Sequence, residues 1–274
     1  MNSIHLQAHI IGLLRHTPCL TFKVVEGAVR RHYPDAARRE IRTAVNILVS
    51  EGRLRYTQRF GLSQLEFNYE RLHRVSERIW LAPAELNPTH PPGGVLIRLA
   101  VGASFGCGDH PTTRLALQAI DRAVDRNRLE ERAVLDIGTG SGVLALAAVA
   151  LGMNSALALD IDRLACHEAR ANVRLNGYQE RIVVSDQPLA ALTCQQFDLV
   201  IANLRPPTLK LLFDQMCRYT APNGVWVLSG FRCQEMPDLR PYVENGNRMI
   251  LWEEKDADWG VWLVDVRQSR EKAL

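Results

Sequence analysis

A glycine-rich turn constrains this chain more than any other feature of its sequence. The short apolar run Val134–Ile137 contains one acid, Asp136, and is followed by Gly138–Gly142, in which every second residue is glycine. A second apolar run, Val143–Leu151, comes next, so the pattern predicts a strand, a tight turn and a helix. Glycine permits a close approach to a ligand, and the helix presents unpaired N–H groups to whatever lies over the turn.

The spacing of the glycines separates two classes of ligand. A dinucleotide-binding turn has the pattern G-x-G-x-x-G/A, which requires glycine or alanine at position 143, where this chain has Val143. A second acid, Asp160, ends the next apolar run, 22 residues after Gly138. In a nucleoside-binding βαβ unit, an acid at this strand tip accepts hydrogen bonds from the ribose hydroxyls. The two features together predict a nucleoside ligand, and the alternatives for Asp160 are a loop acid or a helix N-cap.

Length and composition favour a protein with two folded parts. The 274 residues suffice for one large domain and a smaller one, and 47% hydrophobic residues argue against disorder. No apolar run approaches the roughly 20 residues that span a bilayer, and no signal peptide is recognisable. The six cysteines show no C-x-x-C motif and no zinc-type spacing with histidine. We therefore expect a cytoplasmic protein with reduced thiols, no metal and no membrane association.

Residues 1–72 are expected to form a small α+β domain. Helical periodicity predicts three helices, over 4–15, 21–32 and 35–52. Thr21 and Asp35 are the expected N-caps of the second and third helices. A partly alternating pattern over 53–69 predicts a hairpin that turns near Gly61. Three helices followed by a two-stranded wing resemble a winged helix.

The same domain carries a modest excess of positive charge. Residues 1–70 hold ten Lys and Arg against six acids. Arg38, Arg39 and Arg42 lie at the start of the third expected helix, where the recognition helix of a winged helix meets phosphates and base edges. Three interpretations stay open: nucleic-acid binding, the solvated face of a packing helix, and a role in dimerisation or in capping a substrate.

Residues 73–100 are expected to connect this domain to a larger one at 101–274. The connector contains one strand-like piece, Ile79–Ala82, and a proline-rich stretch, 83–92. Short apolar runs then alternate with helical patterns, which argues for a mostly parallel sheet covered on both faces. The strand candidates are 133–137, 156–160, 181–184, 197–202, 224–230, 248–253 and 260–266. The last two, joined by the turn Asp256–Asp258, are expected to be antiparallel.

Three further segments narrow the interpretation of the larger domain. Upstream of the glycine turn lies Ser104–Leu115, with the sequence SFGCGDHPTTRL. Downstream lie Val200–Leu204 (VIANL) and, after Pro222–Gly224, the segment Leu228–Phe231 (LSGF). With the G-x-G-x-G turn, they resemble the PrmA family of class I methyltransferases, which methylate amino groups of a large-subunit ribosomal protein with S-adenosylmethionine (SAM). The resemblance covers about residues 95–266 and implies a Rossmann-like, mostly parallel, seven-stranded sheet.

The resemblance also implies a cofactor site. The residues expected to bind SAM are Phe105, Gly106, Gly108, Thr113, Asp136, Gly138, Gly140, Gly142, Asp160, Ile161, Asp186 and Asn203. Within this set, Asp160 would hold the ribose and Asp186 would face the adenine amino group. The turn 105–108 and Thr113 would border the methionine end.

Asn203 and His110 are the expected catalytic residues. The amide and the backbone carbonyls at Asn203 would accept from the substrate amine and orient its lone pair towards the methyl group. The alternative for His110 is a packing or capping role, and the alternative for Asn203 is a loop cap. Asp136 either bonds the methionine ammonium through water or braces the turn. Cys107, which replaces a threonine of the family, is expected to be a small buried neighbour of the ligand. Pro206–Pro207, also a departure, would stiffen the loop over the site.

The largest departure from the family lies in residues 1–72, where PrmA proteins carry a small α/β module that recruits the substrate. We therefore expect a SAM-dependent methyltransferase that acts on an amino group of a protein. In the family that the chain resembles, this acceptor is a ribosomal protein. One alternative is a small-molecule methyltransferase that uses its N-terminal domain as the arm of a homodimer and as a lid. The other is a nucleic-acid-binding regulator that senses SAM.

Overall fold

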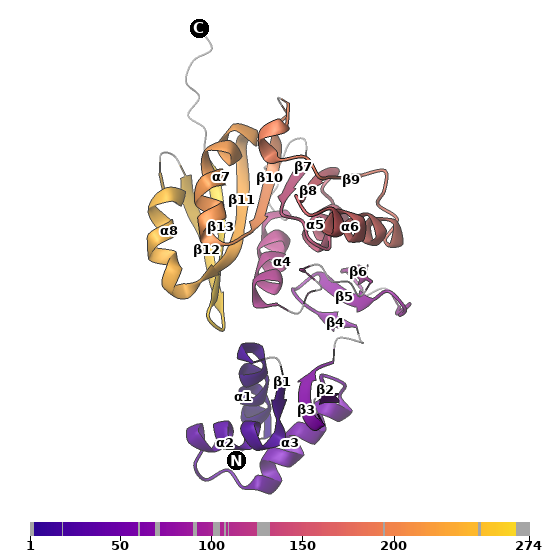
Figure 1. The fold of residues 1–274 in the computed structure, drawn as a ribbon, viewed down its shortest axis with the longest axis vertical. Helices are drawn as coiled ribbons and strands as arrows, with labels where there is room; N and C mark the ends of the chain where they lie inside the picture. Colours follow the sequence, from indigo (N-terminus) through magenta and orange to yellow (C-terminus); the bar gives the residue numbers. More distant parts are fainter. Residues whose placement is uncertain are drawn as a thin grey trace. The chain divides into compact units, whose positions relative to one another are not determined.

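The computed structural model of the chain divides into two compact units, residues 1–71 and 72–274 (Figure 1). The structure describes residues 3–17, 19–59, 61–68, 72–89, 92–100, 105–106, 108, 110–124, 132–193, 195–245 and 248–266. Every helix in these ranges is too short or too polar to cross a membrane.

The first unit contains three helices and a three-stranded antiparallel sheet. Its elements are α1 (Ser3–His16), β1 (Cys19–Thr21), α2 (Phe22–His32), α3 (Arg38–Ser50), β2 (Leu54–Arg59) and β3 (Leu62–Phe67). The strand order is β1-β3-β2. One apolar face of each helix enters a common core, with Ile10, Val29 and Leu48 fully buried. The expected N-cap of α2 is confirmed, because the Thr21 hydroxyl accepts from the Val24 N–H at 3.4 Å.

Two details of this unit differ from the expectation. The N-cap of α3 is Ala37, not Asp35, and the Glu40 carboxylate accepts from the Ala37 N–H at 3.0 Å. A glutamate at the third helical position satisfies that N–H, so the helix begins where Glu40 can reach back rather than at the upstream acid. Strand β1 was not expected either. It is too short to show alternation and exists because it pairs with β3, with Leu20 opposite Leu65.

The second unit contains the expected sheet of seven mostly parallel strands. The strands are β7 (Ala133–Ile137), β8 (Ser155–Leu159), β9 (Ile182–Ser185), β10 (Phe197–Asn203), β11 (Thr220–Arg232), β12 (Arg248–Asp256) and β13 (Trp259–Val266). They follow the order β12-β13-β11-β10-β7-β8-β9, and only the pairs that include β13 are antiparallel. The order reverses between β7 and β10, so their carboxyl ends border the crevice in which open α/β sheets bind ligands.

Helices cover both faces of this sheet (Figure 1). One face packs against α4 (Pro111–Val124), α5 (Val143–Ala150) and α6 (Arg163–Leu175), and the other against α7 (Pro206–Tyr219) and α8 (Met236–Val243). Successive residues of β10 alternate between the two cores, with Ile201 in the first and Val200 and Ala202 in the second. Because both faces are buried, the central strands appear in the sequence as continuous apolar runs.

The segment expected to be a connector folds into a sheet of its own. Its strands are β4 (His73–Arg74), β5 (Ile79–Pro83) and β6 (Val95–Leu99). Strand β5 pairs antiparallel with β4 and parallel with β6. The side chains of Ile79, Leu81 and Ile97 are buried in the core that contains α4 and α5. The small sheet is therefore part of the second unit, and it packs against α4 and α5, the helices before and after the glycine turn.

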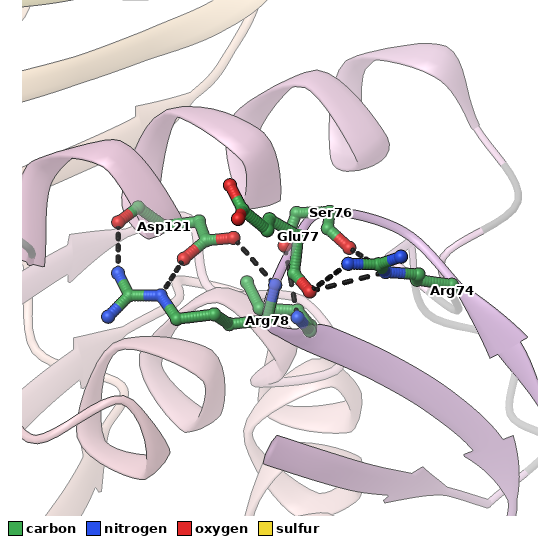
Figure 2. Close-up of polar contacts among 6 residues, drawn as sticks. Arg74, Ser76, Glu77, Arg78 and Asp121 are labelled. Atoms are coloured by element: carbon green, nitrogen blue, oxygen red, sulfur yellow. Dashed lines mark hydrogen bonds and ion pairs between the residues drawn. The ribbon is translucent and has the colours of Figure 1, made fainter. Parts of the chain in front are cut away.

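A buried carboxylate joins this small sheet to α4 (Figure 2). Arg78 Nε lies 2.5 Å from Asp121 Oδ1, and the Arg78 backbone N–H donates to Oδ2 at 3.0 Å. The Asp121 side chain is only 7% exposed, so these charge-assisted hydrogen bonds are well shielded from water. Figure 2 also shows Arg74, which donates to the backbone carbonyls of Ser76 and Glu77 at the surface.

Replacing Arg78 by alanine is expected to lower the free energy of unfolding by about 2 kcal/mol, because Asp121 would stay buried without its guanidinium partner. The matched control, Arg74→Ala, is expected to cost less than about 1 kcal/mol, since it removes surface contacts only. Urea unfolding at neutral pH measures both values. Equal losses in the two variants would contradict the anchoring role of Arg78.

Candidate active site

A pocket of about 720 Å³ opens at the carboxyl ends of β7, β8 and β10. Other parts of the wall come from the short 3-10 helix η1 (Leu189–Ala191), from α7, and from the first residue of β13. The pocket lies where the strand order reverses, and its volume is typical of small-molecule and cofactor sites.

The glycine turn forms the floor of this pocket. Gly138 and Gly140 have φ angles of +74° and +56°, which other residues rarely adopt. A Cβ on Gly138 would overlap Cδ2 of Leu204, and one on Gly140 would overlap the carbonyl oxygen of Phe105. Both glycines line the pocket, whereas Gly142 is the N-cap of α5 and packs against α6. The first two positions thus need glycine both for the backbone angle and for the space.

Asp160 follows β8 and lines the pocket. Its carboxylate accepts hydrogen bonds from the backbone N–H groups of Gly140 at 2.9 Å and Asp162 at 3.0 Å, which fix it at the strand tip. Carboxylate oxygens have further lone pairs, so Asp160 can still accept from a ligand diol. The N-cap alternative is wrong, because Asp162 is the N-cap of α6. Ile161, 85% exposed, also lines the pocket and offers an apolar surface for a planar group.

Asp136 lies beneath the turn and is not part of the pocket lining. Its Oδ2 accepts from the Thr139 hydroxyl at 2.6 Å and from the Ala145 N–H at 3.3 Å. Complete burial raises the pKa of Asp136 to about 7, although these two hydrogen bonds act in the opposite direction. Within the described part of the chain, Oδ1 has no hydrogen-bond partner. The contacts of Oδ2 favour the turn-bracing alternative for this residue.

Asn203 ends β10 and lines the pocket beside the glycine turn. Its Oδ1 is buried and finds no hydrogen-bond partner among the described residues. A loop-capping asparagine would use this oxygen, so the orphaned atom argues against the capping alternative. Leaving such an acceptor unpaired costs about 1–3 kcal/mol, which a ligand N–H group would recover.

One wall of the pocket is aromatic and includes His110. The His110 ring lies 5.0 Å from that of Phe105 and 4.9 Å from that of Trp259, measured between centroids. Its Nδ1 is 2.8 Å from the Thr112 hydroxyl. Burial and then the nearby Arg114 guanidinium lower the pKa of His110, which keeps the imidazole neutral at pH 7. The one acceptor nitrogen of the neutral ring is Nδ1, which accepts from the Thr112 backbone N–H at 3.3 Å.

The upstream motif contributes to the site in a way the sequence did not predict. Phe105 lines the pocket, but Gly106 lies behind it and accepts from the Ser141 hydroxyl at 2.8 Å, which holds the motif against the glycine turn. Thr112 rather than Thr113 lines the pocket, and the Thr113 side chain is fully buried. The threonines lie in the first turn of α4, so adjacent residues face in different directions.

Two other expected cofactor residues lie away from the pocket. Gly108 approaches Leu81 so closely that a Cβ would overlap its side chain, so this glycine serves packing. Asp186 is not part of the lining, and its half-exposed carboxylate pairs with Arg163 at 3.3 Å. Cys107 lies outside the described residues.

Several wall residues were missed. Leu204 and Gly230 lie in the motifs VIANL and LSGF but were not named as site residues. The others carry no motif: Gln187, Pro188, Leu189, Ala190, Arg205, Thr208, Leu212, Gln215 and Trp259. Of these others, Trp259 was the one residue with a signal in the sequence, namely its place directly after the expected turn 256–258. Pro206–Pro207 were also misjudged, since they begin α7 rather than stiffen a loop. The first turn of a helix leaves its N–H groups unpaired, so proline loses nothing there.

The raised pKa of Asp136 predicts a pH dependence of stability. Between about pH 4 and pH 7 the folded protein keeps a proton on Asp136 that the unfolded chain releases. The contribution of this group to stability is therefore complete below about pH 4, falls as the pH rises to about 7, and is constant above that. Asp136→Asn stays neutral throughout and should gain stability relative to the wild type across this window.

Urea unfolding of both proteins from acid to neutral pH measures this difference, with the exposed-site variant Asp186→Asn as the control. If the stability difference between the wild type and the Asp136→Asn variant stays constant from about pH 4 to pH 7, Asp136 is ionised like an ordinary aspartate and the raised pKa is wrong.

Comparison with known proteins places the second unit in a family. The model of the PrmA family, described as ribosomal protein L11 methyltransferase, matches residues 67–264. Ribosomal protein L11 methyltransferase of Dechloromonas aromatica is 38% identical over 166 residues, which are 61% of this chain and 53% of that protein. The protein of the same description from Pelobacter propionicus is 38% identical over 176 residues, 60% of this chain and 57% of the relative. The chain thus spans about half the length of these curated relatives.

A solved structure agrees with this match. The crystal structure of ribosomal protein L11 methylase from Lactobacillus delbrueckii subsp. bulgaricus superposes with a TM-score of 0.64 at 29% sequence identity. It covers 72% of this chain and 100% of its own. The likeness agrees with the class I methyltransferase fold expected from the sequence. Since the family match extends over more than half of the residues, the chain belongs to the PrmA family.

Proposed function

We propose that this protein is a SAM-dependent methyltransferase that acts on an amino group of a protein, with a ribosomal protein such as L11 as the acceptor. The observation that carries the proposal is the unpartnered Oδ1 of Asn203, buried in a pocket beside the glycine turn. The printed descriptions of the relatives, ribosomal protein L11 methyltransferases, support the choice of acceptor.

The residues of the pocket fit SAM. Gly138 and Gly140 present backbone without a side chain to the pocket, which lets a ligand approach closely. Asp160 offers lone pairs to the ribose diol, and Ile161 offers an apolar face to the adenine. When bound, SAM supplies a methyl group activated by its sulfonium. Asp186, in its ion pair with Arg163, has no part in this proposal.

The protein's own groups prepare the acceptor amine. Asn203 Oδ1 accepts one amine hydrogen and thereby directs the nitrogen lone pair, and orientation of this kind lowers the barrier of an in-line transfer. A protonated amine loses its charge more readily in an apolar pocket than in water. His110 does not accept that proton, because the one acceptor nitrogen of its neutral ring, Nδ1, already accepts from the Thr112 N–H at 3.3 Å. The proton leaves to solvent before the transfer. Phe105 and Trp259 flank the imidazole.

The first unit is best assigned to the winged-helix type. Three helices precede a terminal hairpin, and β1 adds a third strand to that hairpin, with the order α1-β1-α2-α3-β2-β3 along the chain. The family match begins at residue 67, so it leaves out all of this unit except its last five residues. We propose that the unit gives the enzyme a binding function separate from the transfer site.

Asp160→Ala is expected to weaken SAM binding by about 10- to 100-fold, because the two ribose hydroxyls lose the charged carboxylate that accepts their hydrogen bonds. Asp186→Ala, at the other acid once expected to contact the cofactor, should change the affinity less than about twofold, since it removes a surface ion pair. Isothermal titration calorimetry with SAM measures both dissociation constants. Equal effects in the two variants would contradict the ribose role of Asp160.

Asn203→Ala is expected to leave SAM affinity almost unchanged and to slow methyl transfer about 100-fold, because the amine loses its orienting acceptor. Gln195→Ala removes an exposed amide outside the pocket and should leave both quantities as they are. Single-turnover transfer from methyl-labelled SAM to L11 gives the rate. Unchanged turnover in the Asn203→Ala variant would end the catalytic assignment of Asn203.

A further inference from the structure

The side of α3 that faces away from the core carries hydrogen-bonding groups and no acid. The opposite side is buried through Ile41, Val45 and Leu48. Positions four, seven and eleven residues after 39 share its direction, because successive helical residues are 100° apart. The outer face of α3 is defined by the four exposed residues at these positions, Arg39, Thr43, Asn46 and Ser50.

Two more arginines flank this outer face. The Arg42 guanidinium lies 5.0 Å from the centre of the Phe22 ring, which orients it without neutralising it. Arg38 pairs with Glu26 at 3.3 Å, yet the arginine side chain remains 63% exposed while the glutamate is 14% exposed. Glu40 uses its carboxylate at the N-cap of the helix. The positive charges of α3 therefore face solvent, and the carboxylates of Glu26 and Glu40 are engaged within the unit.

The hairpin of β2 and β3 follows directly after α3 in the first unit (Figure 1). Gly52, with a φ of +70°, turns the chain between the helix and β2. Tyr56 and Gln58 on β2 are exposed, and Tyr56 keeps 46% of its surface accessible. An exposed aromatic and an amide on a hairpin are groups that contact a sugar–phosphate backbone.

We propose that the outer face of α3 binds duplex DNA, with the helix in the major groove and the hairpin beside it. This inference rests on the winged-helix assignment and goes beyond methyl transfer. The B-DNA major groove, about 12 Å wide, admits an α-helix, and Arg and Asn make bidentate contacts with guanine and adenine there. The major groove of A-form RNA is too deep and narrow for this, so the geometry favours DNA. Without an acid, the outer face does not repel phosphates.

The test measures the binding of the full-length protein to a fluorescein-labelled DNA duplex of random sequence by fluorescence anisotropy, over a salt titration. The affinity should fall as salt rises, because phosphate contacts release counterions. Arg39→Ala/Arg42→Ala should weaken binding at least about tenfold and reduce the slope of the salt dependence. The matched control, Arg174→Ala/Arg218→Ala, removes two exposed charges from helices of the second unit and should bind DNA like the wild type.

Four outcomes would overturn the proposal. Two concern DNA alone: no binding at low salt, or equal losses of affinity in the two double variants. The third is tighter binding of a duplex RNA of the same sequence, and the fourth is normal DNA binding by the Arg39→Ala/Arg42→Ala variant with impaired labelling of the protein acceptor. The last would assign the outer face to a protein partner. Circular dichroism checks that the variants are folded. SAM affinity and methyl transfer are measured in parallel, so a failure of the methyltransferase assignment is seen separately, and both should be unchanged in the Arg39→Ala/Arg42→Ala variant.

Discussion

Much of the second unit depends on one contact, between the glycine turn that follows β7 and the Asp160 carboxylate at the tip of β8. Gly140 donates its N–H to Asp160 across the tips of β7 and β8, and the positive φ of the turn directs that N–H towards the neighbouring strand. Asp136, buried below, receives the Thr139 hydroxyl and a free N–H group from the first turn of α5. The same contacts that close the turn therefore shape the floor of the pocket. A side chain at 138 or 140 would both strain the backbone and overlap Leu204 or the Phe105 carbonyl.

Support for this turn comes from parts of the chain that are distant in sequence. Ser141 holds the upstream motif through Gly106, and the small sheet of β4 to β6 backs α4 and α5 through a shared core and the buried Arg78–Asp121 contacts. The residues at the pocket thus stand on rigid elements, with the orphaned amide oxygen of Asn203 at the end of a buried strand. Rigid support of this kind keeps an unpaired acceptor available for a ligand instead of letting it collapse onto a local partner.

The sequence was informative where a local rule determines the structure. Continuous apolar runs predicted the seven strands of the large sheet, since both of its faces are buried, and the glycine spacing with the acid at 160 predicted where the ligand pocket lies. It was uninformative where the fold alone determines the neighbours. Trp259 and the wall formed by α7 reach the pocket through sheet order, which no residue pattern encodes. Thr113 was chosen by motif position and Asp186 by its place after the third strand. Neither side chain lines the pocket, since Thr113 is buried in the first turn of α4 and Asp186 pairs with Arg163 instead.

The central claim is that the protein binds SAM in this pocket and transfers the methyl group to an amino group of another protein. Mass spectrometry of purified ribosomal protein L11 after incubation with the enzyme and methyl-labelled SAM tests it most directly. We predict L11 carrying whole methyl groups on lysine side chains or on its N-terminal amine, and no such groups when SAM is left out. Unmodified L11, together with label in small molecules of a cell extract and in none of its proteins, would contradict this claim and assign the pocket to a different class of acceptor.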